Sequence, residues 1–312
     1  MKKTFTKFSA GNEILAICYC LYLTLLILLV CQVPGFSFSM YSEVDSSCQF
    51  VDTLYRFIGN PVEQAKCLLR PVRPYGNLGD KLEMLPEVLE KNIGQPFHLS
   101  RSQIEKYLRQ KSIQMSDIGG PLSQPLSRAN DNNEKSAAAG YLVIHDTSTP
   151  NYQYEAFPEN INAPDWKYND LQSWKQGNQS KAHIFINRLG ESVTTFDFKD
   201  AWRATKLEVQ ILRIKSKGLF LHVELIQPRR SDPSGPNGND AIAPDPGFTS
   251  PQLKRLALIY LVASLRRGEW LIPAYHAVVD AGIPGAHDDP QHFDLIQWGN
   301  LLEDLIGEIQ NL

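Results

Sequence analysis

The sequence lacks an excess of basic residues, low-complexity stretches and internal repeats. Its 31 lysines and arginines are outnumbered by 34 aspartates and glutamates, which gives a formal net charge of -3. Binding along nucleic-acid phosphates needs clustered Lys and Arg, so this balance argues against a nucleic-acid-binding protein. With only 20 Gly, 20 Pro and 43% hydrophobic residues in 312, the composition is that of an ordinary globular protein.

Cysteine is also scarce, with five residues in the whole chain. Cys18, Cys20 and Cys31 fall inside one apolar run, which leaves Cys48 and Cys67 outside it. In an oxidising compartment such a pair predicts a disulfide that closes a loop of about 20 residues. Two independent thiols are the alternative.

Residues 14–33 form this uncharged apolar run, and three lysines precede it. The run is long enough to cross about 30 Å of hydrocarbon as a helix, and the lysines predict that the rest of the chain is exported. Small residues ahead of Met40 suit cleavage there. An uncleaved membrane anchor and a lipid-modified Cys31 are alternatives. We therefore expect residues 1–39 to be a signal peptide or anchor, and the body to lie in the periplasm or cell envelope.

Three segments follow the apolar run. Residues 40–118 are predicted to be a small helical region, in which Ser100 and Gln103 form a capping box. The apolar residues at helical spacing near its start are Val51, Leu54, Tyr55 and Ile58. Residues 119–139 are rich in turn-forming residues and indicate a linker, which leaves 140–312 as the main domain.

The main domain alternates predicted strands and helices. Strands are expected at 141–144, 182–186, 192–196 and 219–226, with the second and third joined as a hairpin. One long helix is expected to have Ser250 as its N-cap, and another is expected to start near Asp294. This interspersed order predicts an α/β sheet domain.

Two histidines and a carboxylate are candidate metal ligands. His145 ends the first predicted strand, His276 follows the long helix in a short predicted strand, and Asp289 lies in a loop beside Asp288. Two imidazoles and one carboxylate form a three-ligand zinc site that leaves one position for water. Their spacing matches no compact motif, so the residue types alone carry this interpretation.

Glu224 is an acidic residue within an otherwise apolar predicted strand. Carboxylates are seldom buried unless they are paired, bind a metal or act in catalysis, because removing the charge from water costs several kcal/mol. The alternative is that Glu224 points to solvent on an edge strand and pairs with an arginine.

Six segments occur in the order found in zinc-dependent N-acetylmuramoyl-L-alanine amidases, the family shared by bacterial cell-wall amidases and peptidoglycan-recognition domains. They are YLVIHDTSTP, KAHIFINRLGES, AWRATK, GLFLHVELIQP, FTSPQLKRLALIYLVASLRRG and IPAYHAVVDAGIPGAHDDPQHFDL. The region from Tyr141 to the end resembles this family. The resemblance implies a central mixed β-sheet flanked by helices, and one Zn²⁺ in a groove that takes the glycan–peptide strand.

The resemblance also implies roles for individual residues. His145, His276 and Asp289 stand where the family has its zinc ligands. Glu224 stands at the position of a proposed general base, and His287 stands where many members have a Lys near the developing oxyanion.

The sequence departs from the family pattern near these positions. The interval before Asp289 is longer than usual, which leaves Asp288 as an alternative ligand. Arg203 stands where a His is often found. Together with Trp202 and His183 it is a candidate for binding the substrate. Core packing is the alternative for Trp202, and for His183 the alternative to a metal ligand is a hydrogen-bonded or lining residue within its strand.

These observations predict an exported or membrane-anchored enzyme that uses zinc to hydrolyse the amide between N-acetylmuramic acid and L-alanine in peptidoglycan. The alternatives are a non-catalytic peptidoglycan-binding protein and another zinc amidohydrolase. The expected partners are a muropeptide substrate and, if the apolar helix is retained, the membrane.

Overall fold

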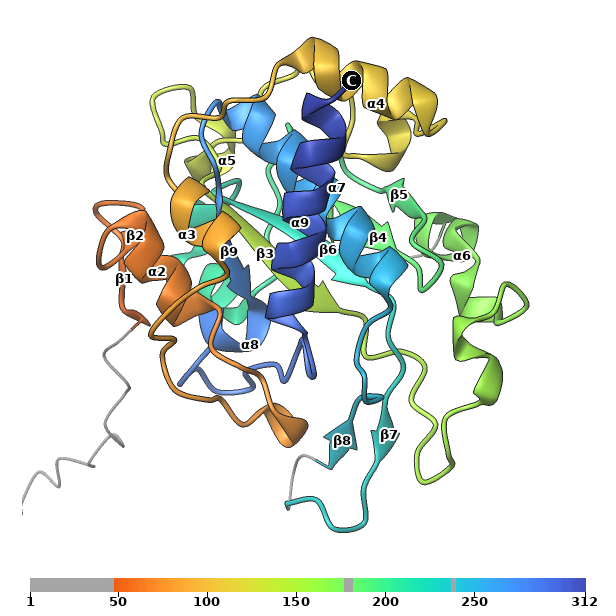
Figure 1. The fold of residues 1–312 in the computed structure, drawn as a ribbon. Coiled ribbons are helices and arrows are strands. Elements are labelled where there is room, and N and C mark those ends of the chain that lie inside the picture. Colours follow the sequence, from red (N-terminus) through yellow and green to blue (C-terminus); the bar gives the residue numbers. More distant parts are fainter. Residues whose placement is uncertain (1–47, 177–181, 237–239) are drawn as a thin grey trace, which may run out of the picture. The chain divides into compact units, whose positions relative to one another are not determined.

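The computed structural model describes residues 48–176, 182–236 and 240–312, which belong to one compact unit. At its centre lies a five-stranded sheet with the strand order β5-β4-β6-β3-β9 (Figure 1). The strands are β3 (Tyr141–Asp146), β4 (Ile184–Ile186), β5 (Ser192–Thr194), β6 (Phe220–Leu225) and β9 (Ile272–Tyr275). The β4–β5 pair is antiparallel and the other three pairs are parallel. The expected α/β fold with a mixed central sheet flanked by helices is confirmed.

Helices α7 (Ser250–Arg267) and α9 (Leu295–Gln310) pack against one face of the sheet (Figure 1). Tyr275 marks this face, because its ring contacts Phe293, which in turn contacts Trp298 of α9. Side chains alternate along a strand, and register partners on parallel strands face the same side. Tyr275 pairs with Ile144, so the next residue of β3, His145, lies on the opposite face.

The ends of the two long helices follow from their sequences. Thr249 caps α7 in a capping box with Gln252, one residue earlier than the Ser250 cap that we predicted. Gly268 ends α7 with a φ of 75°, a left-handed conformation that glycine adopts without strain. Helix α9 starts near Asp294 as expected, and the Asp294 side chain caps it by accepting a hydrogen bond from the Gln297 N–H.

The first described residues differ in part from the prediction. The spacing of Val51, Leu54, Tyr55 and Ile58 indicated a helix, but the chain forms a short hairpin there. Its strands are β1 (Phe50–Val51) and β2 (Arg56–Phe57). The prediction was wrong because the chain reverses direction within this segment, where Tyr55 has a φ of 53°. A disulfide joins Cys48 to Cys67 in α2, as predicted from the two cysteines outside the apolar run.

Helices α2 (Pro61–Leu68), α3 (Glu87–Asn92) and α4 (Arg101–Gln110) follow the hairpin, and the capping box of Ser100 with Gln103 is present. Buried residues of these helices belong to the same core cluster as the sheet. Leu122 and Leu126, from the segment expected to be a linker, belong to that cluster too. Residues 48–118 therefore share a core with the sheet instead of forming one of their own.

The remaining elements are short. They are α5 (Ala129–Asn132), α6 (Leu171–Gln176), α8 (His276–Val279), β7 (Arg230–Ser231) and β8 (Ala241–Ile242). The apolar run at 14–33 lies outside the described residues. Among the residues that are described, no helix is long and apolar enough to cross a membrane.

Candidate metal centre

His145, His276 and Asp289 come together in the folded chain, as the sequence predicted. The two Nδ1 atoms lie 2.8 Å apart, and His276 Nδ1 is 3.0 Å from Asp289 Oδ1. All three residues are at most 2% exposed. The three ligand atoms lie within 4.8 Å of one another, which is the arrangement of a group that can hold one metal ion.

The parallel pairing of β3 with β9 brings the two histidines together. His145 is the next-to-last residue of β3, and His276 directly follows β9, so both leave the same edge of the sheet. Backbone contacts hold the loop that carries Asp289. The Asp146 N–H donates to Asp289 Oδ2 over 3.0 Å, and the Ala277 N–H donates to the Asp289 carbonyl over 2.8 Å.

The neighbouring aspartate takes a different position. Asp288 accepts a hydrogen bond from the Gln291 side chain over 2.9 Å, and its other oxygen lies 3.9 Å from Arg229. Of the two aspartates that the sequence left as alternatives, the structure thus brings Asp289 to the histidines.

Five of the seven histidines form a continuous row across the sheet. The distances between neighbouring ring centroids are 4.3 Å for His287–His276, 4.2 Å for His276–His145, 5.2 Å for His145–His222 and 5.7 Å for His222–His183. The row runs from a half-exposed ring at His287 to a fully buried ring at His183.

The electrostatic environment favours the ligand form of two of the three residues, His145 and Asp289. Burial, followed by the neighbouring His276 and His222, holds the pKa of His145 well below its usual value, so its ring stays neutral. Burial opposes ionisation of Asp289, but His276 beside it keeps the pKa of that carboxyl well below its usual value. Metal binding requires neutral imidazole and ionised carboxylate. His145 and Asp289 therefore have the protonation state of a metal ligand. Burial lowers the pKa of His276, but Asp289 and Asp280 raise it to about 10, so a metal bound at this ring would displace a proton.

The two predicted catalytic residues, Glu224 in β6 and His287 in the loop before Asp289, are each neighbours of one candidate ligand. Glu224 is half-buried and is the register partner of His145, so the two side chains leave the same face of the sheet. The His287 side chain is 50% exposed, and its Nδ1 lies 3.6 Å from Asp289 Oδ1. His287 is therefore more exposed to solvent than the three candidate ligands.

The three predicted substrate-binding residues are placed differently. Trp202 and Arg203 are half-buried, and the Trp202 ring stacks on Phe196 at 4.4 Å. His183 is fully buried. Its Nδ1 accepts the His222 N–H over 3.1 Å and its Nε2 donates to the Asp200 carbonyl over 3.1 Å, so neither ring nitrogen is left for a substrate in this structure.

Two buried carboxylates beside the row were not singled out from the sequence. Asp280 Oδ2 lies 3.0 Å from His276 Nε2, and Glu208 Oε2 lies 3.2 Å from His222 Nε2. Asp280 carries a local signal, because it follows His276 by four residues in a segment that is otherwise apolar. Glu208 carries only the weaker signal of an acidic residue between two apolar ones.

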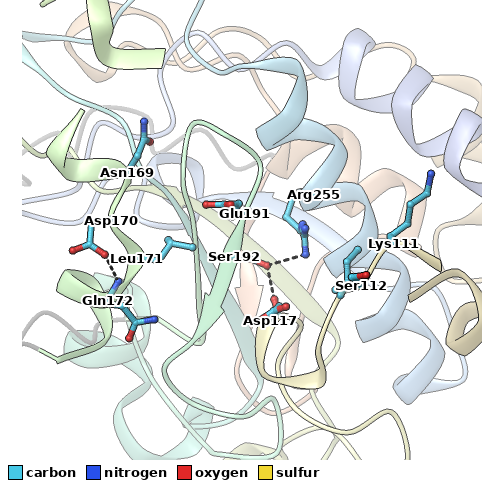
Figure 2. Close-up of a pocket in the computed structure, with 11 residues that line it drawn as sticks. Lys111, Ser112, Asp117, Asn169, Asp170, Leu171, Gln172, Glu191, Ser192 and Arg255 are labelled. Carbon is cyan, nitrogen blue, oxygen red and sulfur yellow. Dashed lines mark hydrogen bonds between the residues drawn. The ribbon is translucent and has the colours of Figure 1, made fainter. Parts of the chain in front are cut away.

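A separate cavity of about 560 Å³ opens at the β5 edge of the sheet, between α4 and α6 (Figure 2). Charged residues of both signs line it, including Lys111, Asp117 and Arg255. The Arg255 guanidinium and the Asp117 carbonyl both contact the Ser192 hydroxyl. None of His145, His276 and Asp289 lines this cavity, so the cavity is not part of the candidate metal centre.

The donor set fits zinc. Two imidazole nitrogens and a carboxylate are the ligands of many catalytic zinc sites, and three protein ligands leave one coordination position for water or substrate. A further observation supports the fit. The Nε2 of each histidine ligand has a buried partner, at 3.0 Å in both cases, which leaves Nδ1 to face the metal.

Comparison with known proteins identifies no family for the chain. No protein-family model matches the sequence, and no curated protein matches it. Among solved structures, Ph2119 endolysin from Thermus scotoductus MAT2119 bacteriophage Ph2119 is 15% identical, with a TM-score of 0.29; the match covers 54% of this chain and 86% of that one. A selenomethionine derivative of AmpD is 17% identical, with a TM-score of 0.36; the match covers 60% of this chain and 98% of that one. Both scores are too low for these neighbours to bear on function.

Proposed function

We propose that this protein is a zinc-dependent hydrolase that cleaves the amide between N-acetylmuramic acid and L-alanine in peptidoglycan. The observation that carries the proposal is the buried cluster of His145, His276 and Asp289, with Glu224 on the same face of the sheet. The six sequence segments that resemble the amidase family support the choice of substrate, because they include these four residues in order.

The residues around the cluster have distinct roles in this reaction. Zinc held by the three ligands would lower the pKa of a water molecule and polarise the amide carbonyl. Glu224 takes the proton of the attacking water and then delivers it to the leaving amine of L-alanine. His287, at the solvent side of the cluster, donates a hydrogen bond to the carbonyl oxygen as negative charge develops there. Trp202 and Arg203 bind the glycan–peptide strand.

We propose further that the protein acts outside the cytoplasm, in the periplasm or cell envelope. The lysines and the apolar run within residues 1–39 support export. The Cys48–Cys67 disulfide is consistent with an oxidising compartment, where such bonds form and persist.

The test combines metal analysis with product analysis. The full chain and its His145→Ala variant are purified, their zinc content is measured, and each is incubated with purified peptidoglycan whose soluble products are identified by mass spectrometry. We expect about one zinc per wild-type chain, as three protein ligands predict, and stem peptides that begin with L-alanine. The His145→Ala variant is expected to lose both the bound zinc and the release of stem peptides.

Other results would lead to other functions. Zinc without released peptide would contradict the amidase and favour a peptidoglycan-binding protein. Release of a different product from a zinc-loaded chain would indicate another amidohydrolase. A wild-type chain that binds no zinc after reconstitution would overturn the proposal.

A further inference from the structure

One partly buried turn holds two of the carboxylates that contact the histidine row, Glu208 and Asp280. The turn comprises residues 204–207, which lead into a π-helical segment at Leu207–Leu212. The N–H groups of Ala204 and Thr205 donate to Glu208 Oε2, both over 3.1 Å. Those of the next two residues, Lys206 and Leu207, donate to Asp280 Oδ2 and Oδ1 over 3.0 Å and 2.9 Å.

Asp280 connects this turn directly to one histidine ligand. Its carboxylate is fully buried, and Oδ2 lies 3.0 Å from His276 Nε2. The same oxygen accepts the Lys206 N–H. The backbone of the turn therefore sets where the Asp280 carboxylate lies, and the carboxylate sets the direction of the His276 ring.

Glu208 connects the turn to the other histidine ligand through His222. Glu208 Oε2 lies 3.2 Å from His222 Nε2, and His222 Nδ1 lies 3.0 Å from His145 Nε2. Glu208 and His222 are both fully buried. The same Glu208 oxygen also accepts the Thr205 hydroxyl over 3.0 Å, so three donors of the turn fix its position.

The direction of hydrogen bonding along this chain matches a ligand role for His145. If Nδ1 of His145 binds a metal, its proton must be on Nε2, where it can be donated to His222 Nδ1. His222 would then carry its own proton on Nε2, the atom that lies 3.2 Å from Glu208 Oε2. Each ring nitrogen then has one role, and the Glu208 carboxylate selects the tautomer of both the His222 ring and the His145 ring.

We propose that Glu208 and His222 are positioning residues for the metal centre, and that the turn at 204–207 orients both histidine ligands through Glu208 and Asp280. This inference rests on the proposed zinc site. Outer partners of liganding histidines typically change metal affinity or activity by about 10- to 100-fold when they are removed. The ordinary alternative is that Glu208 only stabilises the turn whose N–H groups donate hydrogen bonds to it.

The first variant is Glu208→Gln, because the amide oxygen can still accept from the turn while the charge is lost. We expect it to weaken zinc binding by about 10- to 100-fold in a competition titration with a chelator. It should also shift the visible absorption bands of the Co²⁺-substituted protein, since the His145 ring is no longer held in one direction. The melting temperature of the metal-free variant separately measures whether the substitution destabilises the turn at 204–207. Glu308→Gln, on the outer helix α9, is the matched control and should leave zinc affinity and the Co²⁺ spectrum unchanged.

A double variant tests whether Glu208 acts through His222. The His222→Phe variant should weaken zinc binding by a similar factor, and adding Glu208→Gln to it should change the affinity little further, because both lie on one path. Asp280→Asn acts on His276, so its effect should add to that of Glu208→Gln. His98→Gln serves as the control for loss of a histidine outside the row.

Two results would overturn the inference in distinguishable ways. If Glu208→Gln lowers the melting temperature but leaves zinc affinity and the Co²⁺ spectrum as in the wild type, Glu208 serves the turn alone. If the wild-type protein itself binds no zinc, the proposed function fails, and the positioning role fails with it.

Discussion

His145 and Glu224 are register partners on the neighbouring parallel strands β3 and β6. Their Cα atoms are therefore side by side, and their side chains leave the same face of the sheet. One residue belongs to the metal cluster, and the other is the half-buried carboxylate next to it. This pairing places a carboxylate beside a candidate metal ligand, and Glu224 itself is not part of the candidate ligand group.

Replacing that carboxylate should separate binding from chemistry. We predict that Glu224→Gln retains zinc and substrate binding but lowers kcat by about 10²- to 10⁴-fold, the range for loss of a general base. Zinc content, KM and kcat on a soluble muropeptide measure the three effects. Loss of zinc in this variant would instead make Glu224 part of the metal centre.

His287 provides a second test of the chemistry. We predict that His287→Ala keeps its zinc, because the ring lies outside the ligand cluster, and lowers kcat by about 10²-fold through loss of a donor to the oxyanion. His287→Lys should recover part of the lost rate, because its ammonium group can also donate. Equal rates for the wild type and His287→Ala would remove His287 from the mechanism.

Removing the metal should lower the stability of the fold. Zinc at 100 times its dissociation constant stabilises a protein by about 2.7 kcal/mol, so a chelator should lower the melting temperature of the wild type. The melting temperature of Asp289→Ala should be the same with and without zinc. Asp288→Ala is the matched control and should keep the difference, because Asp288 bonds to Gln291 and not to the histidines.

The disulfide offers a test far from the metal cluster. Cys48 and Cys67 are 19 residues apart, and we predict that replacing both with Ser lowers the free energy of unfolding by about 2–4 kcal/mol. Urea denaturation of the metal-free protein measures the loss. A thiol reductant should lower the stability of the wild type by a similar amount and leave the double variant unchanged. An insensitive wild type would show that the bond is not formed in solution.

The buried His183 predicts a loss of stability in acid. Burial, followed by the neighbouring His222, lowers the pKa of His183 to about 3 in the folded protein. In the unfolded chain the pKa is near 6.5, so below that pH the unfolded state binds a proton that the folded state does not. Stability from this residue is therefore complete above about pH 6.5 and is lost as the pH falls toward about 3.

The slope of stability against pH measures this effect. One proton corresponds to about 1.4 kcal/mol per pH unit, and His183→Gln should reduce the slope of the metal-free protein near pH 5 by about that amount. The exposed His98, replaced by Gln, is the control and should leave the slope unchanged. An unchanged slope in His183→Gln would mean that the ring is protonated in the folded state.

Local sequence signals predicted the elements that depend on a few neighbouring residues. The apolar run at 141–144 is a fully buried part of β3, and Ser100 with Gln103 caps α4. The same kind of reasoning failed at Val51, where helical spacing also fits a hairpin that a disulfide ties to α2. A short pattern of apolar residues does not distinguish these outcomes, because packing against the rest of the chain selects one of them.

The sequence by itself determined the metal-ligand candidates, since few residue types bind zinc and the motifs that carry His145, His276 and Asp289 occur in a recognisable order. The tertiary structure alone decided which aspartate joins the histidines, because that choice depends on how the loop before α9 is held. It also decided that Glu208 lies beside His222. Backbone N–H groups at Ala204 and Thr205 hold the Glu208 carboxylate near His222, and contacts between separate segments leave no periodic signal in the sequence.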